Sequence, residues 1–261
     1  MEKRTPFRIT QAVIFALVLR EAKGRFSVNR LGAFWVIFEP LIHVLAVMFI
    51  LTIVRGRHLP GMEFPVFLIS GVVPFLLFKN IALRGMEAVN ANRGLFSYRQ
   101  IKPFDAIIAR AIVEFSLMIS VYGIVLFGLG FWGGFDVAIH EPLHWIGIFL
   151  IGLGFSIGLA LIFCVIAEAM PESRTFIRLL FMPMYIISGV IMPIWVFPPK
   201  LLNWVTWNPF LHIIDLLREA QFQHYPDTPQ ISFSFAIGIS IATMFVGMFL
   251  YRVRRLKLVA L

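Results

Sequence analysis

Residues 176–222 read FIRLLFMPMYIISGVIMPIWVFPPKLLNWVTWNPFLHIIDLLREAQF, and this stretch decides the fold. Its first part, Phe176–Phe197, has the length and apolar character of a membrane-spanning helix. The second part stays apolar but carries Pro198, Pro199 and Pro209, each of which ends or kinks a helix. Backbone broken at membrane depth must be buried in protein or line a watery cavity. The stretch therefore predicts a membrane span followed by a broken, re-entrant segment in a protein that moves something or opens.

Composition places the rest of the chain in a membrane as well. The 261 residues are 59% hydrophobic and 14% charged, with a mean hydropathy of +0.87, which is typical of an integral membrane protein. The single cysteine, Cys164, lies in an apolar run and excludes a disulfide framework within the chain. We expect residues 1–30 to stay in the protein, because the apolar run Ala12–Leu19 is followed by charged residues without a small-residue cleavage site.

Six stretches are apolar over about 20 residues, the length that crosses a bilayer. They are Leu31–Val54, Phe64–Leu83, Ala106–Trp132, Leu143–Ala167, Phe176–Phe197 and Ile231–Tyr251. The shorter run Ala12–Leu19 has basic flanks and predicts a helix that lies in the membrane interface. The expected fold is an all-α polytopic membrane protein with one domain over residues 1–261. Its parts are an interface helix in 1–30, five spans in 31–197, two re-entrant half-helices (Leu201–Val205 and Phe210–Phe222) in 198–230, and the sixth span with a basic tail in 231–261.

Basic residues predict the orientation of these spans. Most of the 23 Lys and Arg residues lie in the N-terminal segment, in the loops after the second and fourth spans, and in the C-terminal tail. The positive-inside rule therefore places both termini in the cytoplasm. Nucleic-acid binding is disfavoured because the sequence has no soluble basic domain to carry it. Tryptophans agree with this orientation, since five of the six fall at outer ends of spans, namely Trp132, Trp145, Trp195, Trp204 and Trp207.

Motifs for catalysis or metal binding have weak support. Residues Gly154–Gly158 match the Gly-x-Ser-x-Gly pattern of serine hydrolases, but within a predicted span the two glycines favour close helix packing. His140 and His144 are four residues apart, which fits a surface pair better than a metal site. The sequence contains no Gly-x-x-x-x-Gly-Lys-Ser/Thr phosphate loop. We therefore expect no catalytic, cofactor-binding or metal-binding residues in this chain.

Charged residues inside the predicted spans are candidates for function, because charge is costly in a membrane. Glu39 and His43 share a helix face in the first span, which fits a structural or gating role near the cytoplasmic mouth better than proton coupling. Arg110 and Glu114 are also four residues apart in the third span, and they either pair with each other or line an inner vestibule. Arg84 lies at the same level, at the end of the second span.

The loop of residues 90–105, NANRGLFSYRQIKPFD, is cytoplasmic in this topology, basic and aromatic. Asp105 can cap the helix that follows. Such a loop is either a lipid-facing connector or a docking element for a cytoplasmic protein, and we favour docking.

The sequence resembles the membrane subunits of type 2 ABC exporters, and most closely the permeases that export capsular polysaccharide from Gram-negative bacteria. The resemblance covers nearly the whole chain. It is carried by LGAFWVIFEP at 31–40, FLISGVVPF at 67–75, KPFD at 102–105 with Arg110 and Glu114, Ser188-Gly189-Val190, NPFLH at 208–212, and Arg218. The Glu39-Pro40 pair favours polysaccharide over drug export. Permeases for O-antigen, teichoic acid, lipid or drug remain alternatives. A channel or secondary carrier would predict an inverted repeat or paired midplane charges, which the sequence lacks.

The resemblance implies a homodimer in the bacterial inner membrane that works with two copies of a separate ATPase, which would bind the ATP and magnesium. The substrate would be a lipid-linked polysaccharide, handed to a periplasmic polysaccharide co-polymerase and outer-membrane export proteins. Three sets of residues would do the work. The ATPase coupling loop would include Asn92, Arg93, Phe96, Tyr98, Arg99 and Lys102. The lateral gate and inner vestibule would include Glu39, His43, Arg84, Arg110 and Glu114. The outer gate would include Trp195, Trp204, Trp207, Asn208, His212 and Arg218.

Overall fold

A computed structural model describes residues 5–26, 38, 41–50, 62–98 and 100–259, and this part of the chain folds into helices. A short apolar helix covers Leu41–Ile50. The labelled elements are α1 (Pro6–Phe26), α3 (Phe64–Met86), α4 (Ala88–Asn92), η1 (Arg93–Leu95), α5 (Pro103–Phe131), α6 (Pro142–Ala169), α7 (Ser173–Ile187), η2 (Ile194–Val196), α8 (Pro199–Val205), α9 (Pro209–Gln221) and α10 (Phe233–Val259).

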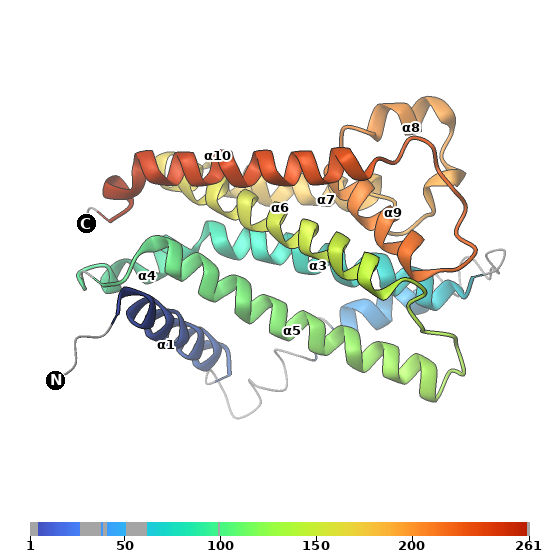
Figure 1. Cartoon of the computed structure of the whole chain (residues 1–261), viewed down its shortest axis with the longest axis horizontal. Helices are drawn as coiled ribbons and strands as arrows, with labels where there is room; N and C mark the ends of the chain where they lie inside the picture. Colours follow the sequence, from blue (N-terminus) through green and yellow to red (C-terminus); the bar gives the residue numbers. More distant parts are fainter. Residues whose placement is uncertain (1–4, 27–37, 39–40, 51–61, 99, 260–261) are drawn as a thin grey trace.

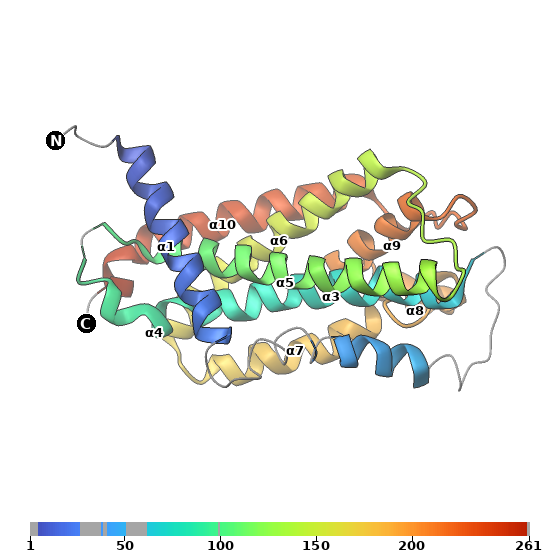
Figure 2. The same ribbon diagram turned by 90° about the horizontal axis from the view of Figure 1, so that it is seen from below.

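Within the described residues, four helices, α3, α5, α6 and α10, are long and apolar enough to cross a membrane. They run along the long axis of the molecule, with α1 crossing them near one end (Figures 1 and 2). The second, third, fourth and sixth predicted spans are thus confirmed as long apolar helices. The predicted first span, 31–54, lies partly outside the described residues, so the count of six spans stays a prediction.

The centre of the bundle is α3, which packs against α5, α6 and α9. The most apolar 18-residue window of this helix is 83% buried, against 17% in α10, so protein surrounds α3 while α10 keeps an apolar outer face. Gly158 of α6 lies against the α10 backbone, where a Cβ atom would collide with Thr243 and Met244. This close approach confirms the prediction of glycine-mediated packing. Ser156 donates to the Gly152 carbonyl (2.7 Å) in its own helix and is fully buried, so it is no exposed nucleophile.

The broken stretch differs from its prediction at one point. We expected a continuous helix from Phe176 to Phe197, and this was wrong, because α7 ends at Ile187. Gly189 follows with a φ of +69°, a left-handed conformation that favours glycine and turns the chain. Helices α8 and α9 lie where the two half-helices were predicted, while their re-entry into the membrane stays a prediction. Pro199 and Pro209 stand in the first turns of these helices, where a missing N–H costs nothing.

Helix α9 begins deep inside the bundle. Phe210 is the second residue of α9. The centroid of its ring lies 5.3 Å from the ring centroid of Phe75, in the middle of α3, and 5.1 Å from that of Phe155, in the middle of α6. The other end of α9 reaches the start of α6, where the Glu141 N–H donates to the Ala220 carbonyl (2.8 Å). Helix α9 therefore runs from the middle level of the bundle to the end at the right of Figure 1.

Candidate functional site

A buried arginine joins α9 to the turn after α7. Arg218 has no exposed surface, and its guanidinium donates to the carbonyls of Gly189 (2.6 Å) and Val190 (2.7 Å). The guanidinium carbon also lies 3.7 Å from the centroid of the Phe67 ring on α3, a cation–π contact. Gly71 makes room for this side chain, because a Cβ atom there would overlap the guanidinium. Arg218 thus binds three elements together.

The start of α9 is fixed by side-chain hydrogen bonds. The Asn208 amide donates to the Ser188 hydroxyl (2.8 Å), and its carbonyl oxygen accepts from the Phe210 N–H (3.1 Å) as a helix cap. His212 pairs with the Thr206 carbonyl through Nε2 (2.7 Å), while its Nδ1 accepts from the Ser232 N–H (3.0 Å). These partners select the neutral tautomer with the proton on Nε2. Together with Arg218, these residues form a buried unit, here called the outer latch (Ser188, Gly189, Asn208, His212 and Arg218).

Two tyrosine contacts extend the outer latch. The Tyr225 hydroxyl donates to the Asp215 carboxylate, and burial raises the pKa of Tyr225 well above its usual range, so the tyrosine stays a donor. The Tyr122 hydroxyl of α5 donates to the Gln221 amide oxygen (3.3 Å). Sequence reasoning did not place Tyr122, Gln221 or Tyr225 in the site. The signal available in the sequence was the spacing of Asp215 and Arg218, which are three residues apart and so share one helix face. In the structure both side chains are buried.

The three predicted gate tryptophans separate into two groups. Trp195 is partly buried, and its ring packs on those of Phe67 (6.2 Å) and Tyr225 (5.0 Å). Trp204 and Trp207 are 80% and 57% exposed, at the end of α8 and in the turn after it. The structure therefore brings Asn208, His212 and Arg218 together and leaves two aromatic side chains on the surface.

Five charged side chains from three helices meet at the opposite end of the bundle and form the inner network. Glu114 of α5 has a side chain only 3% exposed, and it pairs with Arg84 of α3 (2.8 Å) and with Arg25 of α1. Arg110 pairs with Glu21 of α1 (3.2 Å) and donates to the Arg84 carbonyl (2.9 Å). The expected Arg110–Glu114 pair was wrong, because each residue instead faces a partner on α1. Sequence reasoning missed Glu21 and Arg25, since nothing local links them to α5.

His43 and Glu39 are the other two predicted inner residues. His43 is exposed on the helix Leu41–Ile50, and the ion pairs of the inner network do not include it. Glu39 lies outside the described residues, so its predicted pairing with His43 stays a prediction.

The predicted coupling loop turns some residues inward and others outward. Asn92 is buried, accepts from the Arg20 guanidinium (2.8 Å) and donates to the Ala88 carbonyl (2.8 Å). Phe96 is buried in a second apolar cluster with residues of α4, α5 and α6. Tyr98 is 64% exposed and Lys102 is also exposed, whereas Arg99 lies outside the described residues. Asp105 does help to cap α5, but from its third position, where it accepts from the N–H of Lys102, the N-cap residue (3.0 Å).

A second charged network anchors this loop to α6 and α7. Arg93, half exposed, pairs with Glu168 at the end of α6. Glu168 also binds Arg174 (3.2 Å), and Arg178 pairs with Glu87 at the start of α4 (2.7 Å). These ion pairs connect α4 and η1 to the end of α6 and the start of α7.

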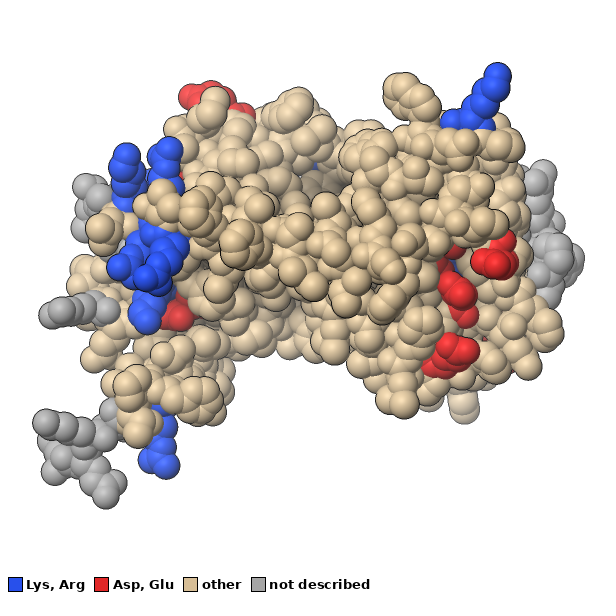
Figure 3. All heavy atoms as spheres, turned by 45° about the horizontal axis from the view of Figure 1, so that its top comes forward, with Lys and Arg blue, Asp and Glu red and all other residues tan. Residues whose placement is uncertain are grey.

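Charge is distributed unevenly over the surface. Figure 3 shows most basic side chains of this face gathered at the end where α10 finishes, with some acidic ones beside them, and mainly acidic side chains at the opposite end. The exposed basic residues at that end of α10 are Arg252, Arg254, Arg255 and Lys257.

Comparison with known proteins identifies relatives over most of the chain. The chain is 36% identical over 251 residues to the polysialic acid transport protein KpsM of Escherichia coli, covering 96% of each chain. It is 25% identical to the capsule polysaccharide export inner-membrane protein CtrC of Neisseria meningitidis, over 82% of this chain and 80% of the relative. It is 22% identical to the capsule polysaccharide export inner-membrane protein BexB of Haemophilus influenzae, over 90% of this chain and 88% of the relative. The model of the ABC-2 type transporter family matches residues 12–222, which include the inner network, the coupling loop and the outer latch. This chain therefore belongs to the ABC-2 type transporter family.

Proposed function

We propose that this chain is the membrane-spanning permease subunit of an ATP-driven exporter, which moves lipid-linked capsular polysaccharide across the bacterial inner membrane. The observation that carries the proposal is the 36% identity to a polysialic acid transport protein over 96% of both chains. The apolar helices α3, α5, α6 and α10 fit a multi-pass membrane protein. The uneven surface charge in Figure 3 supports an orientation with the basic end in the cytoplasm.

Two copies of the chain would form the pore, and two copies of a separate ATPase would supply the energy. The full sequence has no phosphate loop, so ATP and magnesium would be bound by the partner. We propose that Arg93, Tyr98 and Lys102 face the ATPase, because they are exposed on one loop. The buried residues Asn92 and Phe96 would hold this loop rigidly on the bundle, so that movement of the ATPase reaches α6 and α7 through Glu168 and Glu87.

The inner network would control where substrate enters. Helix α1 is held against α3 and α5 by Glu21, Arg25, Arg84, Arg110 and Glu114. Helix α7 and the helix Leu41–Ile50 lie on the same face of the bundle (Figures 1 and 2). A lateral gate for a lipid-linked polymer would open on that face, and Glu39 and His43 would lie beside it.

The segment of α8 and α9 would form the outer gate. Helix α9 begins in the middle of the bundle and the outer latch is buried, and both observations support a re-entrant segment. Backbone polar groups that leave a helix inside a membrane must form their hydrogen bonds with protein. Trp204 and Trp207 offer exposed ring faces on which sugars can stack during passage. The loops at this end would meet the periplasmic co-polymerase and the outer-membrane export proteins.

Deletion of the gene and complementation with the chain test this function. We expect polymer to accumulate inside deletion cells and to return to the surface on complementation. Normal surface polysaccharide in the deletion strain would refute capsule export and favour the alternatives, export of O-antigen, teichoic acid, lipid or drug. Purification of the tagged chain separately tests whether an ABC ATPase binds to it and co-purifies.

A further inference from the structure

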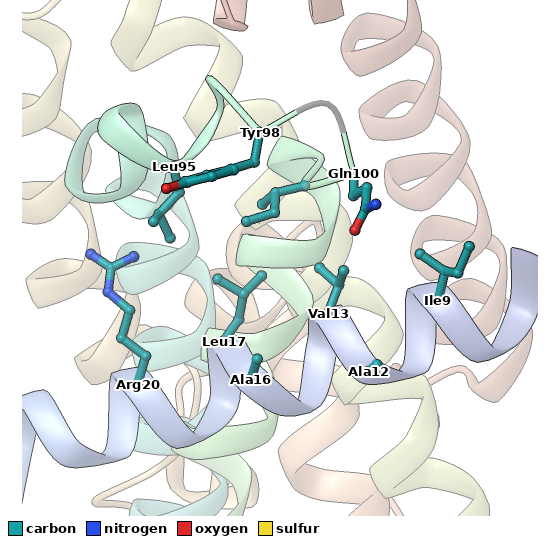
Figure 4. A pocket seen from close by; sticks show the side chains of 10 residues that line it. Ile9, Ala12, Val13, Ala16, Leu17, Arg20, Leu95, Tyr98 and Gln100 are labelled. Carbon is teal, nitrogen blue, oxygen red and sulfur yellow. The ribbon is translucent and has the colours of Figure 1, made fainter. Parts of the chain in front are cut away.

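A cavity of about 550 Å³ lies between α1 and the loop that follows η1. Figure 4 shows α1 crossing beneath this loop, with Val13 and Leu17 pointing up from the helix and Tyr98 lying above them. The volume falls in the range of about 300–1,000 Å³ that is usual for small-molecule sites. Neither the outer latch nor the inner network uses this cavity.

The wall of the cavity is largely apolar, with a few polar side chains among the lining residues. Ile9, Val13 and Leu17 of α1 face Leu95 and Ile101 of the loop. The polar lining residues are Arg20, Tyr98 and Gln100. Arg20 is exposed and uses one guanidinium nitrogen, Nη1, for its bond to Asn92. An arginine has five N–H donors, so others stay available for an anion. This combination fits a molecule with one long apolar part and one anionic group.

The remainder of α1 indicates where that molecule comes from. Phe7, Phe15 and Leu19 are 78%, 63% and 44% exposed, so apolar side chains cover the outside of this helix. Arg8 and Lys23 are exposed on the same helix. A helix with exposed apolar and basic side chains lies in the membrane interface and attracts anionic lipid. A position of α1 in the membrane interface would put the cavity at the level where lipid headgroups meet acyl chains.

We propose that the cavity between α1 and the coupling loop binds an anionic phospholipid of the inner leaflet. An acyl chain would lie along Val13 and Leu17, and the phosphate would meet Arg20 and the Tyr98 hydroxyl. The lipid would then link the interface helix to the loop that we assign to ATPase docking. The site needs only that the chain spans a membrane, so it does not depend on which polymer is exported.

Photo-crosslinking of lipid to the full chain in proteoliposomes tests the site. The probe is phosphatidylglycerol with a diazirine on one acyl chain, at low abundance in phosphatidylethanolamine vesicles, and labelled peptides are identified by mass spectrometry. We expect labelling of residues 9–20 and 95–101. Val13→Trp, which fills the cavity, should reduce this labelling about tenfold, the effect of losing a contact of 1.4 kcal/mol. Arg20→Gln should reduce it about fivefold, because each basic group near an anionic surface contributes about 1 kcal/mol.

Two control variants distinguish the cavity from general lipid contact. Phe15→Trp adds the same indole on an exposed position of α1, and Lys23→Gln removes a charge that does not line the cavity. Both should keep wild-type labelling. Equal labelling in all variants, or equal labelling by a phosphatidylethanolamine probe, would overturn the proposal. If the bound ATPase abolishes the labelling in the complete complex, the cavity is a protein docking site and the lipid proposal is wrong.

Discussion

The guanidinium of Arg218 donates a 2.6 Å hydrogen bond to the carbonyl of Gly189, the glycine whose φ of +69° turns the chain after α7. A buried positive charge thus stabilises a turn that leaves backbone carbonyls inside the bundle. The cation–π contact with the Phe67 ring is a second favourable interaction of the buried guanidinium.

Arg218→Lys should destabilise the protein by about 2–3 kcal/mol, since a lysine lacks the planar fork that reaches both carbonyls. Thermal unfolding in detergent, followed by fluorescence-detected size exclusion, measures the effect. Lys200→Ala, at an exposed position of α8, is the control and should unfold like the wild type. Unchanged thermal stability of Arg218→Lys would show that the two hydrogen bonds contribute little.

Gly71→Ala tests the space beside the same guanidinium. The added methyl group would overlap Arg218, and overpacking of this kind costs about 1–3 kcal/mol. Gly147→Ala in α6 is the matched control, because a Cβ atom there meets no atom within 4 Å. The control should be neutral or slightly stabilising, since alanine favours a helix over glycine. The same thermal assay compares the two variants, and equal unfolding temperatures would contradict the close packing.

Glu114→Gln should release α1 from the bundle. The substitution removes the negative charge that faces Arg25 and Arg84 and costs about 3 kcal/mol or more where charges are buried. Limited trypsin digestion should then cut after Lys23 or Arg25 faster than in the wild type, and the N-terminal fragment reports the rate. Glu141→Gln, at a half-exposed side chain, should leave the digestion rate unchanged. Equal rates for both variants would mean that α1 is held by its apolar contacts alone.

Arg93→Glu should reduce both co-purification of the ATPase and polymer export. The ion pair with Glu168 complicates this test, because the substitution also breaks an internal contact. Glu168→Gln breaks the same pair while keeping Arg93, and it should retain the ATPase. The double variant Arg93→Glu/Glu168→Arg restores an internal pair with reversed charge. If the double variant recovers full export, Arg93 acts only inside the chain and the docking role is wrong.

Trp204→Ala should lower export without lowering stability. The side chain is 80% exposed, so its removal leaves no cavity in the core. Surface polysaccharide and thermal unfolding are measured on the same variant. Trp195→Ala is the contrasting variant, since that ring packs on Phe67 and Tyr225 and its loss should lower the unfolding temperature. Normal export with Trp204→Ala would exclude this ring from the polymer path.

The sequence predicted what depends on local patterns. Hydropathy located α3 and α6, and the half-helices predicted at Leu201–Val205 and Phe210–Phe222 overlap α8 and α9. The errors lie where tertiary contacts compete with local spacing. Arg110 and Glu114 are four residues apart, yet each pairs with α1, because helices distant in the sequence meet at that end of the bundle.

Burial within the coupling loop was equally hidden from the sequence. Asn92 and Phe96 look like surface residues of a polar loop, but Arg20 of α1 and the apolar cluster of α4, α5 and α6 hold them inside. Their partners lie on other elements, so no local pattern could reveal them.

Helix α9 starts in the middle of the bundle and runs back to the end where α8 lies (Figure 1). It therefore does not carry the chain from one end of the bundle to the other. If α9 instead ran the full length of the bundle to the basic end, α10 would have to begin at that end. Because α9 turns back, α10 runs again toward the basic end, and the C-terminus lies at the same end as α4 (Figure 1). A second helix can therefore start inside the bundle, at Pro209, without changing the end of the molecule at which the chain finishes.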